Sequence, residues 1–263
     1  MASKHFGKAE IFQLTNEGIP PKLAERMIIP EHIRVNGHVL LPYVQKELIP
    51  QDLDLILLDD LNGFFHQLTE NNFHFTSNCR GLYVAQDHVW IPDGNYQRTN
   101  NALKREYGIS SPRALLLPEK RIDYWTMIHE ALHDVFNNLP SEKRIQLVQA
   151  VTAVYNTNGK FHNLLDLTHL NVSNFDWDIE NIAQKMEENR IAKRPIADGI
   201  DEFYTFPRLK PSDQLQVVDE FIANFFANDR GKDRWSPRYL HPSFRATLRE
   251  VGYNVDSPPE VMP

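Results

Sequence analysis

One twelve-residue stretch constrains the fold of this chain more than any other: residues 125–136 read WTMIHEALHDVF. Its apolar residues recur at the three- and four-residue spacing of an amphipathic α-helix. Side chains four residues apart on such a helix stand one above the other, so His129 and His133 present their imidazoles to one point. Asp123 suits the N-cap, and the run 137–140, NNLP, ends the helix.

The pattern His-Glu-x-x-His on a helix is typical of zinc sites. Glu130 projects to the same side as the histidines, where it can reach a metal-bound water without binding the metal. Zinc lowers the pKa of that water toward neutrality, and the carboxylate then takes its proton. The alternative is a surface-margin helix whose histidines are solvated. The apolar stripe beside the pair favours the metal site and thus metal-assisted hydrolysis.

A catalytic zinc ion usually has three protein ligands and one open position. A metzincin would supply the third ligand from a continuation of the motif, with Gly at 136 and His at 139. This chain has Phe136 and Leu139 there, which excludes that class. Five other residues are candidates by type and context: His162, His169, Glu187, Glu188 and Glu220.

Glu220 is favoured by its surroundings. It lies in a nearly all-apolar helix that we expect to be buried, where an uncompensated carboxylate costs free energy. Asn224, one turn later, is placed to accept the second ring N–H of a ligand histidine. The residues one turn beyond the competing glutamates are apolar. The structural alternative is that Glu220 pairs with an arginine, Arg234 or Arg238.

Two blocks, HEALH at 129–133 and EFIANFFA at 220–227, together resemble the gluzincin pattern of the anthrax-lethal-factor-like and Mlc-titration-factor-like metallopeptidases. The resemblance implies a zincin fold and a zinc metallopeptidase acting on a peptide or protein substrate. It also implies one zinc ion held by His129, His133 and Glu220, with Glu130 as general base. The chain departs from these relatives in a longer interval between the blocks and in Asn224, where acidic residues are common.

The function has one alternative: a protein-binding or regulatory module that has the zincin fold but has lost catalysis.

The residue that stabilises the oxyanion also stays open. Zinc metallopeptidases of this kind often place a Tyr or His for that purpose. The candidates here are Tyr204, Tyr239 and His241, and we favour Tyr239 because its loop follows the Glu220 helix and can fold back over the site.

Periodicity predicts an α+β fold with a small mixed sheet and a mostly helical C-terminal half, and the resemblance implies that this fold is zincin-like. We expect an N-terminal lobe of residues 1–118 and a helical lobe of residues 119–263, with the cleft between them. The predicted helices are 22–27, 51–70, a stretch ending at Tyr107, the motif helix, 141–156, 178–192, 212–227 and 243–251. The predicted strands are 32–35 and 38–41, which form a hairpin, and 73–75, 81–85, 88–91 and 113–117.

Two of these elements carry finer expectations. Strand 113–117 lies between Pro112 and Pro118, and because proline cannot donate to a sheet we expect an edge strand that a substrate can extend. An ordinary strand or buried loop is the alternative. In helix 141–156, the residues expected to share the buried face are Ile145, Val148, Val151 and Tyr155.

Composition excludes several other classes of protein. The net charge of -7 with scattered Lys and Arg argues against nucleic acid as a partner. No run of 18 apolar residues occurs, and residues 1–8 lack a signal-peptide core, so we expect no membrane partner and a cytoplasmic location. Cys79 is the only cysteine, which excludes an intrachain disulfide and a cysteine-rich zinc site.

Overall fold

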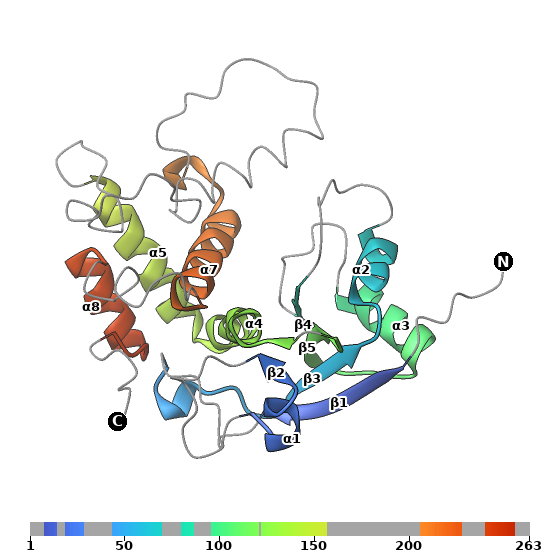
Figure 1. Cartoon of the computed structure of the whole chain (residues 1–263). Coiled ribbons are helices and arrows are strands. Elements are labelled where there is room, and N and C mark those ends of the chain that lie inside the picture. Colours follow the sequence, from blue (N-terminus) through green and yellow to red (C-terminus); the bar gives the residue numbers. More distant parts are fainter. Residues whose placement is uncertain are drawn as a thin grey trace, which may run out of the picture. The chain divides into compact units, whose positions relative to one another are not determined.

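The computed structural model of the chain shows an α+β protein (Figure 1). It describes residues 8–14, 19–28, 44–69, 80–86, 96–120, 122–156, 206–227 and 240–255. The described residues up to Asn137, apart from Val44 and Gln45, belong to one compact unit. Those two residues and the described residues from Asn138 onward belong to a second unit.

The helices and strands of each unit follow in chain order. The first unit contains β1 (Ala9–Leu14), α1 (Pro21–Ala24), β2 (Met27–Ile28), η2 (Lys46–Leu48), β3 (Leu53–Leu58), α2 (Leu61–Thr69), β4 (Leu82–Ala85), α3 (Tyr96–Tyr107), β5 (Arg113–Pro118), β6 (Ile122–Asp123) and α4 (Tyr124–Asn138), of which only the last residue belongs to the second unit. The second unit contains α5 (Ser141–Asn156), η4 (Phe206–Arg208), α7 (Pro211–Ala227) and α8 (Pro242–Val251).

A four-stranded mixed sheet with the order β1-β3-β5-β4 organises the first unit. Strand β3 runs antiparallel to β1 and parallel to β5, and β4 closes the row antiparallel to β5. The short strands β2 and β6 form a separate parallel pair, and β6 leads directly into α4. The sheet thus confirms the predicted small mixed sheet.

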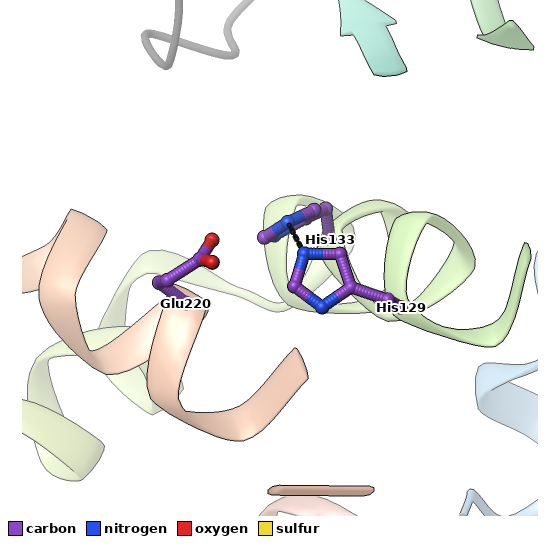
Figure 2. Close-up of side chains that lie close together, drawn as sticks. All are labelled: His129, His133 and Glu220. Carbon is purple, nitrogen blue, oxygen red and sulfur yellow. Dashed lines mark hydrogen bonds between the residues drawn. The ribbon is translucent and has the colours of Figure 1, made fainter. Parts of the chain in front are cut away.

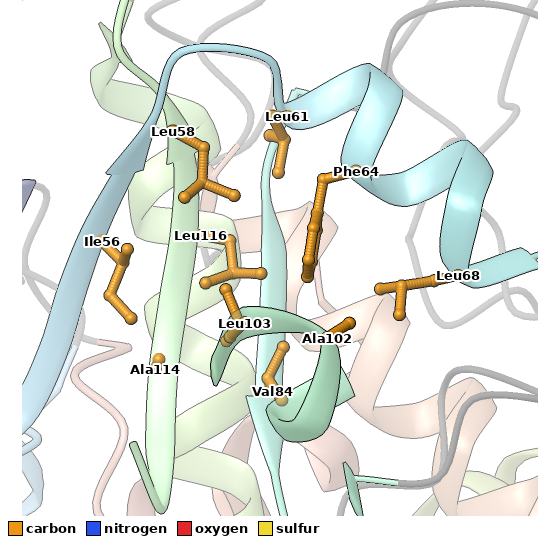
Figure 3. Close-up of a cluster of buried hydrophobic side chains, with 10 residues drawn as sticks. All are labelled: Ile56, Leu58, Leu61, Phe64, Leu68, Val84, Ala102, Leu103, Ala114 and Leu116. Carbon is orange, nitrogen blue, oxygen red and sulfur yellow. The ribbon is translucent and has the colours of Figure 1, made fainter. Parts of the chain in front are cut away.

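Helices α2 and α3 pack on one face of this sheet (Figure 3). Because side chains alternate along a strand, every second residue of β3, β4 and β5 reaches this cluster. Its members are Ile56, Leu58, Leu61, Phe64, Leu68, Val84, Ala102, Leu103, Ala114 and Leu116. The intervening residues point to the opposite face, where Tyr83 reaches the side chain of Asp134 on α4. The sheet therefore has buried side chains on both faces.

The prediction of a single helix over residues 51–70 is wrong. Residues 53–58 form strand β3, and only Leu61–Thr69 is helical. Leu53 and the residues from Leu55 to Leu58 are all buried, because β3 is an interior strand with packing on both faces. An interior strand carries an unbroken apolar run, whose spacing also matches one face of a helix.

The prediction that residues 113–117 form an edge strand is also wrong. Strand β5 pairs with β3 on one side and with β4 on the other. Pro112 precedes β5 and Pro118 is its last residue, so neither proline interrupts the hydrogen bonds of the strand's middle. Within the described residues, the strands at the two ends of the sheet are β1 and β4.

Most other predicted elements are confirmed, with ends shifted by no more than three residues: α1, β4, α3, α4, α5, α7 and α8. In α5 the expected buried face is confirmed only in part. Val151 is buried as expected, but Ile145 is half exposed and Val148 is half-buried. Leu147 and Val154 are buried as well, and the side chain of Tyr155 lies outside the described residues. The predicted hairpin at 32–41, the strands at 73–75 and 88–91 and the helix at 178–192 lie outside the described residues.

Helix α5 packs against α7 and α8 in the second unit. Aromatic rings join α7 to α8 and to the residues after it: Phe221 meets Phe244 edge to face, and Phe226 stacks in parallel on Tyr253. Across both units, no helix in the described ranges combines the length and apolar character needed to cross a membrane.

Candidate metal centre

Asp123 fixes where the motif helix α4 begins. Its Oδ2 accepts a hydrogen bond from the backbone N–H of Thr126 at 3.0 Å and from the Thr126 hydroxyl at 2.8 Å. This is the contact by which an N-cap side chain satisfies a backbone N–H left over at the start of a helix. The prediction of Asp123 as N-cap is confirmed.

His129 and His133 face each other one turn apart on α4, as their spacing predicts. Their Nε2 atoms lie 3.1 Å apart, and the two rings are nearly perpendicular, at 89°. His133 is buried and His129 is half-buried. Two nitrogens bound to a tetrahedral zinc at the usual bond length of about 2.0–2.1 Å stand about 3.3 Å apart. The pair thus already has nearly the separation that one metal ion requires.

Glu130 lies on the same helix turn and is only 9% exposed. Its side chain passes close to Gly81, the residue before β4. A Cβ atom added at Gly81 would stand 2.9 Å from Cγ of Glu130, closer than Cβ atoms approach non-bonded atoms, and 3.0 Å from its Oε1, which is tighter than most such contacts. The absence of a side chain at Gly81 therefore leaves the space that the carboxylate of Glu130 occupies.

A buried polar network lies beside the histidine pair, and the sequence analysis did not find it. Asp134, which follows His133 on α4, is fully buried. Its Oδ1 accepts a hydrogen bond from the Tyr83 hydroxyl at 2.8 Å. The same oxygen lies 3.0 Å from Nε of Arg113 and forms an ion pair with it, although the angle does not suit a hydrogen bond. One signal was present in the sequence: an acidic residue inside the apolar stripe of a helix.

The electrostatics of this network follow from its burial. Burial, and then the negative charge of Asp134, raise the pKa of the Tyr83 phenol far above its ordinary value, so Tyr83 stays protonated and donates. The guanidinium of Arg113 supplies the opposite charge that a buried carboxylate needs. The ring of Tyr83 also stacks against the His133 imidazole, with centroids 6.4 Å apart and planes inclined by 23°.

Glu220 lies in the middle of α7, as predicted, but its side chain is half-buried rather than buried. The buried carboxylate of this helix is its neighbour Asp219, which is 4% exposed. The expected role of Asn224 also changes. Its Nδ2 donates a hydrogen bond to Oε1 of Glu220 at 2.8 Å, so the contact it makes is with the candidate ligand Glu220 itself.

Three side chains in the described part of the chain form a group able to hold a metal ion (Figure 2): His129, His133 and Glu220. One ligand atom from each residue lies within 4.8 Å of the corresponding atoms of the other two. Two imidazole nitrogens and one carboxylate oxygen form a donor set that catalytic zinc sites use. The chemistry of the group therefore fits zinc.

The remaining candidates fall mostly outside the described residues: His162, His169, Glu187, Glu188, Tyr204, Arg234, Arg238 and Tyr239. Their roles stay predictions. His241 is described, and its Nδ1 lies 2.7 Å from the hydroxyl of Ser243 at the start of α8.

No family model, no curated protein and no solved structure matches this chain.

Proposed function

We propose that this chain is a zinc-dependent metallopeptidase with a zincin-like arrangement, in which His129, His133 and Glu220 hold the metal and Glu130 is the general base. The observation that carries the proposal is that His129, His133 and Glu220 form one group, with ligand atoms within 4.8 Å of one another. It joins the two sequence blocks that resemble gluzincins.

A bound zinc ion supplies a Lewis acid that lowers the pKa of water toward neutrality and polarises a carbonyl. Glu130 follows the first histidine and is nearly buried, in the space that Gly81 leaves open. In this position its carboxylate accepts the proton of the attacking water and later delivers a proton to the leaving amine.

The test compares wild type with Glu130→Gln, which keeps the shape of the side chain and removes its basicity. Purified wild type should bind one zinc ion per chain, by metal analysis, and cleave an unstructured protein or a peptide library. Glu130→Gln should lose about 10²-fold or more of this activity, the usual contribution of general acid–base catalysis, and retain the zinc. Glu142→Gln, an exposed glutamate on α5, is the matched control and should behave as wild type.

Two results contradict the proposal. Wild type without stoichiometric zinc removes the metal site. A zinc-loaded wild type that cleaves no peptide, with Glu130→Gln indistinguishable from it, favours the non-catalytic binding module instead.

A further inference from the structure

The buried pair Tyr83 and Asp134 connects the sheet to the motif helix at the position next to His133. Tyr83 comes from β4 and Asp134 from α4, and the Tyr83 hydroxyl donates to Asp134 Oδ1 at 2.8 Å. The amide of Asn137, one turn beyond His133, lies 3.5 Å from the same hydroxyl. Both contacts are made by residues of the helix that carries the two histidines.

Arg113 of β5 adds a second connection to the same carboxylate. Its Nε lies 3.0 Å from Asp134 Oδ1, and its terminal nitrogen donates to the backbone carbonyl of Gln51. Asp134 is therefore held by side chains from two neighbouring strands of the sheet. On a helix, the side chains of consecutive residues leave the axis in directions about 100° apart. Holding the side chain of Asp134 therefore also fixes the direction in which the side chain of His133 leaves the helix.

The ring of Tyr83 acts on His133 directly. The two rings are stacked at 6.4 Å with an interplanar angle of 23°, and the ring of His129 lies 4.7 Å from that of His133. The His133 imidazole thus has two ring neighbours, an aromatic ring from the sheet and its partner histidine. Such packing lowers the conformational entropy that the imidazole loses when a metal fixes its orientation.

We infer that Tyr83 and Asp134 are positioning residues of the metal centre, which hold His133 in the orientation that binds the ion. The inference rests on the proposed metal site and deepens it. Neither residue touches the metal or the substrate in this role. A carboxylate so close to a ligand histidine also increases the negative potential at the site, which favours a cation.

Zinc affinity tests the inference, measured by competition with a chelator. Tyr83→Phe keeps the ring stacked on His133 and removes the hydroxyl that Asp134 accepts. We expect the dissociation constant for zinc to rise by up to about tenfold, the low end of the effect of losing a ligand's own outer contact, because the hydroxyl acts on His133 only through Asp134. The absorption spectrum of the Co²⁺-substituted protein should change as well, since it reports on ligand geometry.

The matched control is Tyr107→Phe. It also removes a buried phenol hydroxyl from the first unit, where the ring of Tyr107 packs edge to face on Phe64. A purely structural effect of losing a buried hydroxyl leaves the zinc affinity equal in both variants. Equal zinc affinity for Tyr83→Phe and Tyr107→Phe overturns the inference.

Asp134→Asn provides a second variant should Tyr83→Phe fail to fold, because an amide oxygen still accepts from Tyr83 while the charge is lost. An unchanged zinc affinity in this variant overturns the inference in the same way. The outcomes stay separate from those for hydrolysis. A wild type that binds zinc but cleaves nothing ends the proposed catalysis and leaves the positioning role standing, whereas a wild type without zinc ends both.

Discussion

Gly81 lies against Glu130 so closely that a methyl group at Gly81 would enter the space of the glutamate: its Cβ would stand 2.9 Å from Cγ of Glu130 and 2.8 Å from Cγ2 of Thr126. The general base of the proposed reaction is therefore shaped by a residue from a loop next to β4. Any side chain at this position must displace either the glutamate or the helix.

Gly81→Ala should lower kcat by about tenfold or more, because a shift of about 1 Å in a catalytic group can cost up to 10²-fold in rate. Zinc content should remain that of wild type, since the change is at Glu130 and not at a ligand. Gly108→Ala is the control: its φ of +71° disfavours alanine, yet no atom lies within 4 Å of the added carbon. It should lose about 1 kcal/mol of stability or more and keep the wild-type rate. Equal rates for Gly81→Ala and wild type would contradict the prediction.

Asn224→Ala should weaken zinc binding about tenfold, because the amide at 2.8 Å holds the carboxylate of Glu220 in one orientation. Chelator competition measures the change. Gln214→Ala serves as control, since it removes an amide of the same helix that donates to the backbone of Phe206 at 3.1 Å. Should Asn224→Ala and Gln214→Ala bind zinc equally well, Asn224 has no role at the site.

Leu116→Ala should destabilise the protein by about 2–5 kcal/mol, since Leu116 is fully buried in the interior strand β5 and its loss leaves a cavity. Ile145→Ala should change stability by less than about 0.5 kcal/mol, because Ile145 is half exposed on α5. Urea denaturation compares the two variants. A small effect at Leu116 would argue against the interior position of β5.

Tyr107→Phe should reduce the loss of stability at alkaline pH. Burial, and then the charges of Asp60 and Asp59, raise the pKa of Tyr107 to about 12 from 10.0. The folded state thus retains a proton that the unfolded state loses above pH 10, so the free energy of unfolding falls as pH rises from 10 toward 12. Tyr83 and Tyr253, whose pKa values burial also raises, retain part of this dependence in the variant.

Urea denaturation at pH 9 and at pH 11 tests this prediction. The difference in unfolding free energy between wild type and Tyr107→Phe should change in favour of the variant at the higher pH. The same difference at both values would show that Tyr107 does not titrate differently in the two states.

Local patterns were sufficient for the elements that carry the candidate ligands. The apolar spacing of 125–136, the cap at Asp123 and the i, i+4 separation of His129 and His133 all depend on contacts within one helix. Helix α7 followed from the same periodicity. The period of a helix is a property of neighbouring residues, so a single sequence is enough to predict these features.

The strand β3 shows where such patterns fail. The residues LDLILL satisfy both a helical face and a doubly buried strand, and only pairing with β1 and β5 decides between them. The order of the sheet likewise moved β5 from the edge to the interior, because strand pairing joins residues distant in sequence. Neither result can be deduced from the residues of one segment.

The sequence by itself therefore determined that this protein has a helix with two convergent histidines, a glutamate between them and a second helix carrying Glu220 and Asn224. Only the tertiary structure decided what surrounds them: Gly81 beside Glu130, and Tyr83 and Arg113 around the buried carboxylate of Asp134. The physical reason is range. Helical spacing acts over four residues, whereas these contacts join residues 21 to 51 positions apart and form only when the sheet packs against α4.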